Sequence, residues 1–248
     1  MADFQLKPDS VARHPWHTDS SQQALQRLDS GPDGLDKAEV DRRRQRFGPN
    51  DLPERKRPGL LTIILRQFKD PLIYILLIAG TVSLLLGNYE DTIFIFAILV
   101  INGVIGTIQE WRAESSAQAL QEMVRVQATV LRSGQRHSLD ARELVPGDIV
   151  LLESGNSVPA DLRLLESGDL GTDESLLTGE STSVSKDAGA QLEEDTPLGD
   201  RTNLVHAGTT VADGRGRGVV VRTGRATEVG KIAESLSEES EPPPLVVR

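Results

Sequence analysis

Two long uncharged runs dominate the hydrophobic pattern of the chain. Residues 71–89 read PLIYILLIAGTVSLLLGNY, and residues 92–109 read TIFIFAILVINGVIGTIQ. A helix of about 18 residues covers roughly 27 Å, close to the ~30 Å hydrocarbon core of a bilayer. The pattern therefore predicts a transmembrane helical hairpin with an acidic turn at Glu90 and Asp91. The alternative is a buried hairpin of a soluble protein, which the lack of a polar face disfavours.

Basic residues flank these runs, whereas the turn between them holds only acids. The flanking residues are Arg55, Lys56, Arg57, Arg66 and Lys69 before the first run, and Arg112 and Arg125 after the second. Lys and Arg favour the cytoplasmic side of a membrane. We therefore expect a multi-pass protein of the plasma (cell) membrane, with its soluble portions in the cytoplasm. The first run begins some 70 residues into the chain, which excludes a signal peptide.

Residues 1–68 are expected to form a helical region. Residues 20–23 (SSQQ) and 36–39 (DKAE) have the spacing of capping boxes, and the Gly-Pro pairs at 31–32 and 48–49 mark helix ends. The arginines of the second helix, between residues 42 and 46, are read as a solvated face, with contact to anionic lipid as the alternative. His14 and His17 have a metal-like spacing, but no third ligand is near them in sequence.

After the second run, a helical stalk is expected to continue to Met123. From Val124 the residues alternate between apolar and polar, and further strand-like runs follow at 148–152, 161–165 and 218–221. Turn residues separate them at 133–134, 145–148, 153–156 and 213–214. This pattern predicts a compact β-domain of about 110 residues. A last helix is expected near Thr227, before an acidic, Pro-rich linker at 234–248.

The charge balance and the cysteine count exclude several functions. Lys and Arg total 27 against 37 Asp and Glu, for a net charge of -10. Such a chain lacks the basic footprint of a nucleic-acid partner. It contains no cysteine, which excludes disulfide scaffolds, zinc ribbons and thiol nucleophiles.

One hydroxyl-rich loop carries the candidate chemistry. Residues 172–186 read TDESLLTGESTSVSK, and the candidate site residues are Thr178, Gly179, Glu180 and Ser181. Gly179 lets the backbone approach a ligand closely, and hydroxyls and amides nearby can hold a water or a phosphoryl oxygen. Glu180 could then act as a general base. Taken alone, the tetrapeptide is a weak signal, and the pattern of these four residues favours an ordinary surface loop.

The longer context resembles a known family. TDESLLTGES, with VPGDIVLLESGNSVPADLRLLES before it and NLVHAGTTVADGRGRGVVVRTGRATEVGKIA after it, resembles the actuator domain of P-type ATPases. RRQRFGPNDLPE and FKDPLIYILLIAG resemble the cation-transporter N-terminal domain and first membrane helix of the type II, calcium-pump-like branch. The resemblance extends from about Trp16 to Ile232. Asn156 departs from it, because the family more often has Asp at that position.

The resemblance implies a mixed α and β membrane protein. Its parts would be an N-terminal helical region (1–68), a transmembrane hairpin (69–111), a stalk and actuator domain of distorted jelly-roll type (112–233), and a linker toward a third membrane helix (234–248). In this family, the loop docks on the phosphorylation site, where the glutamate matching Glu180 activates the water that hydrolyses an aspartyl phosphate. Glu174 is expected merely to hold the loop. The motifs at 146–148 and 158–161 are read as structural.

Other parts of such a pump are missing from the sequence. It contains no Asp-Lys-Thr-Gly motif for the phosphorylated aspartate, and residues 224–231 do not have the spacing of a P-loop. We therefore expect an N-terminal portion of an ATP-driven cation pump, inactive alone, whose ATP and Mg²⁺ sites belong to missing phosphorylation and nucleotide-binding domains. Calcium is the favoured cation. The alternatives are a membrane-tethered regulatory module without catalysis, and an unrelated membrane-anchored β-domain that binds a small ligand.

Overall fold

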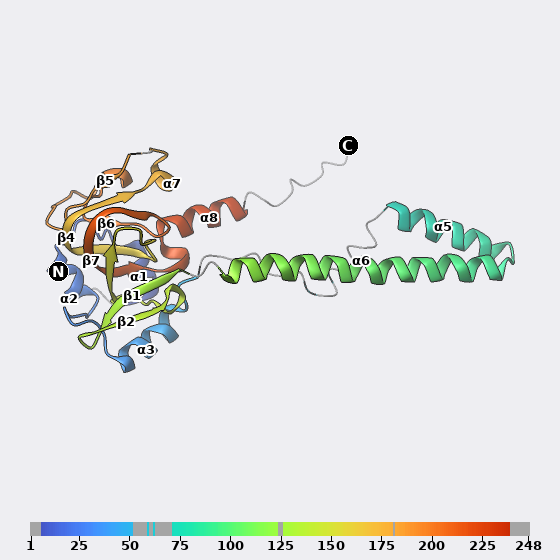
Figure 1. Cartoon of the computed structure of the whole chain (residues 1–248), viewed down its shortest axis with the longest axis horizontal. Helices are drawn as coiled ribbons and strands as arrows, with labels where there is room; N and C mark the ends of the chain where they lie inside the picture. The colour runs from blue at the N-terminus through green and yellow to red at the C-terminus, as the bar shows by residue number, and fades with distance from the viewer. Residues whose placement is uncertain are drawn as a thin grey trace. The chain divides into compact units, whose positions relative to one another are not determined.

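The computed structural model describes residues 6–51, 59, 62, 71–123, 126–180 and 182–238, and it divides the chain into two compact units (Figure 1). The first unit combines Met1–Glu54 with Val126–Arg248, and the second is Arg55–Arg125. The N-terminal helices and the C-terminal strands therefore belong to one unit, although the second unit separates them in sequence.

An antiparallel sheet forms the centre of the first unit. Its described strands are β1 (Gln127–Arg132), β2 (Gln135–Asp140), β3 (Ile149–Glu153), β4 (Asp161–Asp173), β5 (Val184–Ser185), β6 (Leu204–Val205) and β7 (Thr210–Arg222). They follow the order β2-β1-β3-β7-β4-β5, and β6 pairs with β4. The predicted strand-like runs are confirmed as β1, β3, β4 and β7, while β2, β5 and β6 are additional.

The turn expected at Asp213 and Gly214 is wrong, because both residues lie inside β7. Gly214 has φ +73°, and a Cβ there would overlap the carbonyl of Asp169 on β4. The pairing of β4 with β7 also shifts register between Gly168 and Gly171. The glycine therefore lets a long strand bend closely over its partner instead of reversing the chain.

Both faces of the sheet are buried at β3 and at the end of β7, which explains the continuous apolar runs there. Val150 and Val220 point into one core cluster with Val130 and Leu162. Their neighbours Ile149 and Val219 point to the opposite face. There they pack against residues of the N-terminal segment, among them Val11, Trp16, Ala24 and Leu28. Alternating side chains of one strand thus serve two cores.

The N-terminal segment forms α1 (Pro8–Arg13), α2 (Ser21–Arg27) and α3 (Lys37–Phe47). The capping box predicted for the first of the two expected helices is present at Ser20, and Asp36 caps α3 by accepting a hydrogen bond from the Glu39 amide. Gly48 ends α3 with φ +76°. The two predicted helices are confirmed, and α1 is additional.

Five short elements complete the described part of the first unit. They are the 3₁₀ turns η1 (Ala141–Glu143), η2 (Leu198–Asp200) and η3 (Gly224–Ala226), and the helices α7 (Ser175–Thr178) and α8 (Glu228–Glu238). The last of these confirms the helix predicted near Thr227.

The second unit contains α5 (Pro71–Leu85) and α6 (Tyr89–Met123), which pack against each other (Figure 1). The predicted helical stalk to Met123 is confirmed.

Among the described residues, one segment, Tyr89–Ala113, is long and apolar enough to cross a membrane, whereas Ile73–Leu85 is shorter. The first run is not one helix over 71–89, because the chain turns after Leu85 with Gly87 at φ +78°. A hairpin of two membrane spans thus remains a prediction, and the basic residues at 55–57, 66 and 69 lie outside the described ranges.

Candidate functional site

The loop identified from the sequence connects β4 to β5. Thr172 pairs with Val184, so the antiparallel ladder brings the two ends of the loop together. Thr178 is the last residue of α7, and Gly179 and Glu180 follow it directly. Three of the four candidate residues therefore lie side by side on one loop. The fourth, Ser181, lies outside the described residues.

Hydrogen bonds within the loop fix its backbone. Gly179 adopts the left-handed conformation, φ 76° and ψ 0°, and its N–H donates to the carbonyl of Ser175 at 2.9 Å. The Thr178 hydroxyl donates to the Glu174 carbonyl at 3.2 Å, and it accepts from the Glu180 N–H at 3.3 Å. The α7 turn and Gly179 together determine where the Glu180 backbone lies.

A carboxylate at the start of α7 is also held by hydrogen bonds. Asp173 Oδ1 accepts the Ser175 N–H at 3.0 Å. Hydrogen bonds from the Ser175 side chain and then from its backbone lower the pKa of Asp173, because they favour the ionised form.

The candidate side chains face solvent. Thr178, Gly179 and Glu180 are all exposed, and Leu176 beside them is 66% exposed. An exposed carboxylate on a projecting turn can act on a group that docks from outside the chain. It is not arranged to act on a ligand enclosed by its own unit.

The base of this loop is buried and charged. The Lys186 ammonium lies 2.5 Å from Glu174 Oε1, and both side chains have 1% exposure or less. The Thr172 hydroxyl donates to the same carboxylate oxygen at 3.1 Å. Burial lowers the pKa of Lys186, and the attraction of Glu174 opposes that shift. Sequence reasoning assigned Glu174 a holding role but missed its partner, which lies twelve positions further on.

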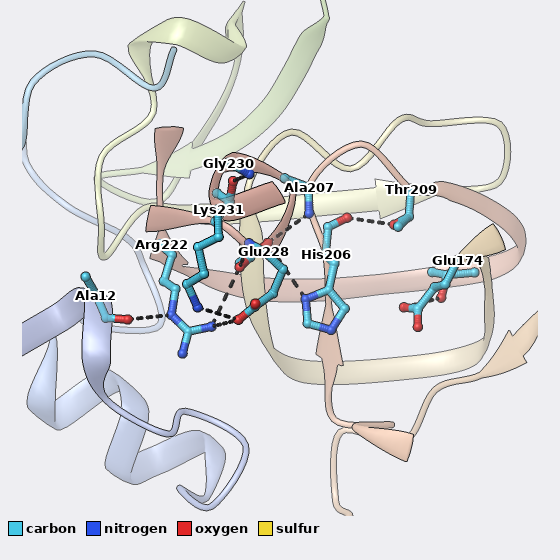
Figure 2. A network of polar contacts seen from close by, with 12 residues as sticks. Ala12, Glu174, His206, Ala207, Thr209, Arg222, Glu228, Gly230 and Lys231 are labelled. Carbon is cyan, nitrogen blue, oxygen red and sulfur yellow. Dashed lines mark hydrogen bonds and ion pairs between the residues drawn. The ribbon is translucent and has the colours of Figure 1, made fainter. Parts of the chain in front are cut away.

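A second polar network joins the ends of several elements (Figure 2). Arg222, at the end of β7, donates to the carbonyl of Ala12 at 3.0 Å and to Glu228 at 2.9 Å. Glu228 also accepts from Lys231 at 2.9 Å. Asp161 accepts the N–H groups of Ala207 and Glu228, at 3.0 and 3.1 Å. This network fixes the start of α8 against the sheet, in agreement with the structural interpretation of residues 158–161.

His206 lies beside this network and was not singled out from the sequence. It is fully buried, and its Nδ1 is 3.8 Å from Asp161 Oδ1. Neither ring nitrogen has a hydrogen-bond partner among the described residues. This buried position could not be recognised from the sequence, because a single histidine in the stretch NLVHAG has no spacing to other polar residues that would mark a site.

The other residues marked by the sequence have structural contacts. Asp148 accepts two bonds from Arg132, at 2.8 and 2.7 Å, which agrees with the structural interpretation of residues 146–148. Asn156 accepts the Glu153 N–H at 3.1 Å and closes a turn. His14 lies 2.7 Å from Asp19, and His17 donates to the carbonyl of Glu194 at 3.2 Å.

The part of the chain that the structure describes contains no group of side chains that fits a magnesium site. Within the described ranges, no three His, Cys, Asp or Glu side chains are grouped so that they could hold a metal ion. Glu180 stands alone on its exposed turn, and residues 224–231 form η3 and the start of α8. We therefore derive no step through nucleotide or magnesium within this chain.

Comparisons with known proteins match two stretches of the chain, which include most of the first unit and the beginning of the second. The P-type ATPase actuator domain matches residues 122–237, and the cation transporter/ATPase N-terminus matches residues 16–83. The chain is 48% identical, over 83% of its length, to a probable cation-transporting ATPase F of Mycobacterium bovis. It is 43% identical, over 91%, to a calcium-transporting ATPase of Listeria monocytogenes, and 45% identical, over 82%, to one of Bacillus subtilis.

The matched regions cover 23 to 26% of these three relatives, so the chain spans about a quarter of their length. The two family matches occur in the order expected from the resemblance. Together they include the first hydrophobic run up to residue 83 and the loop with Glu180, whereas the second run lies between them. The chain therefore belongs to the P-type cation-transporting ATPases, whose N-terminal and actuator domains it contains.

Proposed function

We propose that this chain acts as the actuator part of an ATP-driven cation pump, in which its loop promotes hydrolysis of an aspartyl phosphate. The observation that carries the proposal is the position of Glu180. Its carboxylate is exposed directly after a left-handed glycine, on a loop whose base is buried. The named relatives are cation or calcium pumps, which supports this function over a purely regulatory module.

Each loop residue has a distinct proposed role. Glu180 accepts a proton from the water that attacks the phosphorus. The bond between the phosphorus and the aspartate oxygen then breaks, which releases phosphate and restores the aspartate carboxylate. A carboxylate and a phosphate repel each other, so the water lies between them. Gly179 has no side chain to obstruct a docking partner, and Thr178 orients the Glu180 amide through its hydroxyl. Ser181 is proposed to complete this surface.

The rest of the pump would supply what this chain lacks. We propose that the phosphorylated aspartate and the sites for ATP and Mg²⁺ belong to further domains of the same pump. Two of the relatives named above are calcium-transporting ATPases, which favours Ca²⁺ as the transported cation. The lipid bilayer of the plasma membrane would surround two spans, one within Tyr89–Ala113 and the other formed with the shorter helix α5. The proposed domain limits remain 1–68, 69–111, 112–233 and 234–248.

Substitution of Glu180 in a complete pump that carries this chain tests the proposal. Glu180→Gln keeps the shape of the side chain but removes its basicity, so phosphoenzyme decay should slow by roughly 10²–10⁴-fold while phosphorylation persists. Rapid-quench measurement of labelled phosphoenzyme gives both rates. Glu193→Gln, at another exposed acid, is the matched control. Decay at the wild-type rate in Glu180→Gln would refute the role of Glu180.

A further inference from the structure

The Glu174–Lys186 ion pair is an unusual feature of the first unit. Its side chains are 1% and 0% exposed, whereas the Glu166–Arg217 pair has the same 2.5 Å separation with Glu166 67% exposed. Removing two charges from water costs several kcal/mol per ion, and their attraction rarely exceeds that cost. An apolar pair of similar volume would serve the fold equally well. Simple stabilisation therefore does not explain why charges occupy this place.

The carboxylate of Glu174 is also incompletely satisfied. Its Oε1 contacts Lys186 and accepts from Thr172, whereas Oε2 is buried without a hydrogen-bond partner among the described residues. The ammonium is thus the main compensation for a buried negative charge. Such a pair is directional, because rotation of either side chain away from the other leaves a buried charge unpaired.

The pair lies where the loop leaves the sheet. Glu174 follows the last residue of β4 and is the N-cap residue of α7, and Lys186 follows the last residue of β5. The Lys186 N–H donates to the carbonyl of Leu170 on β4 at 2.8 Å. Both partners are therefore attached to paired strands, and their side chains close the loop beneath its exposed tip.

The hydrogen bonds of the tip lead back to Glu174. Its carbonyl accepts the N–H groups of Leu177 and Thr178, at 2.9 and 3.0 Å, and also the Thr178 hydroxyl. That hydroxyl in turn accepts the N–H of Glu180. The ion pair anchors the Glu174 side chain, and any shift of the Glu174 backbone would be passed along this chain of bonds to the backbone of Glu180.

We propose that Glu174 and Lys186 are positioning residues, whose buried ion pair sets the orientation of the loop that presents Glu180. For its consequence in catalysis, this inference rests on the proposed function. The orientation of the loop, however, can be measured on the chain alone.

Replacement of both charges separates orientation from stability. In Glu174→Met/Lys186→Met no buried charge is left unpaired, so strands β3 and β7 should stay as protected from hydrogen exchange as in the wild type. The amides of Leu177, Thr178 and Gly179 should lose about tenfold or more of their protection. Hydrogen exchange of the detergent-solubilised chain, followed by mass spectrometry, measures both regions. Glu166→Gln, which weakens the Glu166–Arg217 pair at its exposed carboxylate, should change neither.

Two outcomes of the exchange experiment would overturn the proposal. Wild-type protection of the loop in the double variant would show that the charges do not orient it. Equal loss of protection in the loop and in β3 and β7 would show that the pair serves the whole sheet rather than the loop.

The effect of the Glu174–Lys186 pair on hydrolysis of the aspartyl phosphate is tested in a complete pump that carries this chain. The double variant should form phosphoenzyme at the wild-type rate but should hydrolyse it about tenfold more slowly. Wild-type decay in the double variant, while Glu180→Gln is slow, would overturn the positioning role alone. Wild-type decay in Glu180→Gln itself would overturn the proposed function, whatever the exchange experiment shows.

Discussion

The guanidinium of Arg43 occupies the space that a side chain on Gly147 would need. Arg43 is buried on α3, and it donates to the carbonyls of Leu28 and Pro146, at 2.7 and 2.9 Å, and to that of Asp29 at 3.0 Å. Gly147 lies in the turn before β3 with φ +99°. One arginine therefore joins the N-terminal helices to the sheet, and a glycine makes room for it.

Gly147→Ala should consequently destabilise the first unit. The left-handed backbone strains any L side chain, and the added methyl group must displace a buried arginine from its three carbonyls. We expect the free energy of unfolding to fall by about 2–4 kcal/mol. Urea unfolding of the detergent-solubilised chain, followed by circular dichroism, measures this loss.

Gly155→Ala is the matched control, because Gly155 also has positive φ, +86°, but a Cβ there would meet no atom within 4 Å. Only backbone strain remains, so the expected loss is about 1 kcal/mol. Equal losses in the two variants would show that the contact with Arg43 is unimportant.

A pH dependence follows from His17. Its Nε2 donates to the carbonyl of Glu194, while its buried Nδ1 has no partner among the described residues. Burial and then the positive charge of Arg201 lower the pKa of His17 from its ordinary value of 6.5. Between pH 6.5 and the lower pKa of the folded chain, His17 is therefore protonated in the unfolded chain but still neutral in the folded chain. Stability should fall as the pH drops from 6.5 through the folded pKa, and it should be independent of this group above 6.5.

The comparison of His17→Asn with the wild type isolates this effect. Between pH 8 and pH 5 the melting temperature of the wild type should fall more steeply than that of the variant, with the two curves diverging only below about pH 6.5. His137→Asn, at an exposed position, should keep the wild-type slope. Parallel curves for His17→Asn and the wild type would contradict the assignment.

Local signals predicted the fold well where neighbouring residues determine it. Ser20 and Asp36 cap helices within their own turn, and the apolar runs around Val150 and Val220 form strands because both faces are covered. The β2 strand, QRHSLD, was not predicted, because it lies at the edge of the sheet and has no buried face to give it alternation.

Long-range contacts were beyond the reach of sequence patterns. Trp16 packs against strands more than 130 positions away, and the periodicity of nearby residues cannot identify so distant a partner. The loop residues from Thr178 to Glu180 could be recognised by resemblance. Their support by Lys186 could not, because a lysine in a polar stretch is ordinarily exposed, and only the folded β4–β5 pairing buries it.

The purified chain should form no phosphoenzyme by itself. Its sequence lacks the Asp-Lys-Thr-Gly motif, and no group of His, Cys, Asp or Glu side chains among the described residues could hold a metal ion. Incubation with γ-labelled ATP and magnesium, followed by acid precipitation, should give no more label than a heat-treated sample. A complete calcium-transporting relative serves as the positive control. Acid-stable label above background would show that the phosphoryl acceptor lies within these residues.

The last prediction concerns the membrane topology of the second unit. Tyr89–Ala113 is long and apolar enough to span a bilayer, but an odd number of spans would place the N-terminal helices and the sheet on opposite sides. Such a separation is incompatible with their shared core, in which Trp16 and Leu28 pack with Ile149 and Val219. If Tyr89–Ala113 crosses the membrane, the segment before it must therefore cross as well, so that both portions remain on one side. From the basic flanks we predict that this side is the cytoplasm. Trypsin added to right-side-out vesicles should leave the sheet intact, whereas lysed vesicles should release fragments of it. Cleavage within residues 126–238 by trypsin outside sealed vesicles would show that the sheet lies on the opposite side of the membrane from the one predicted.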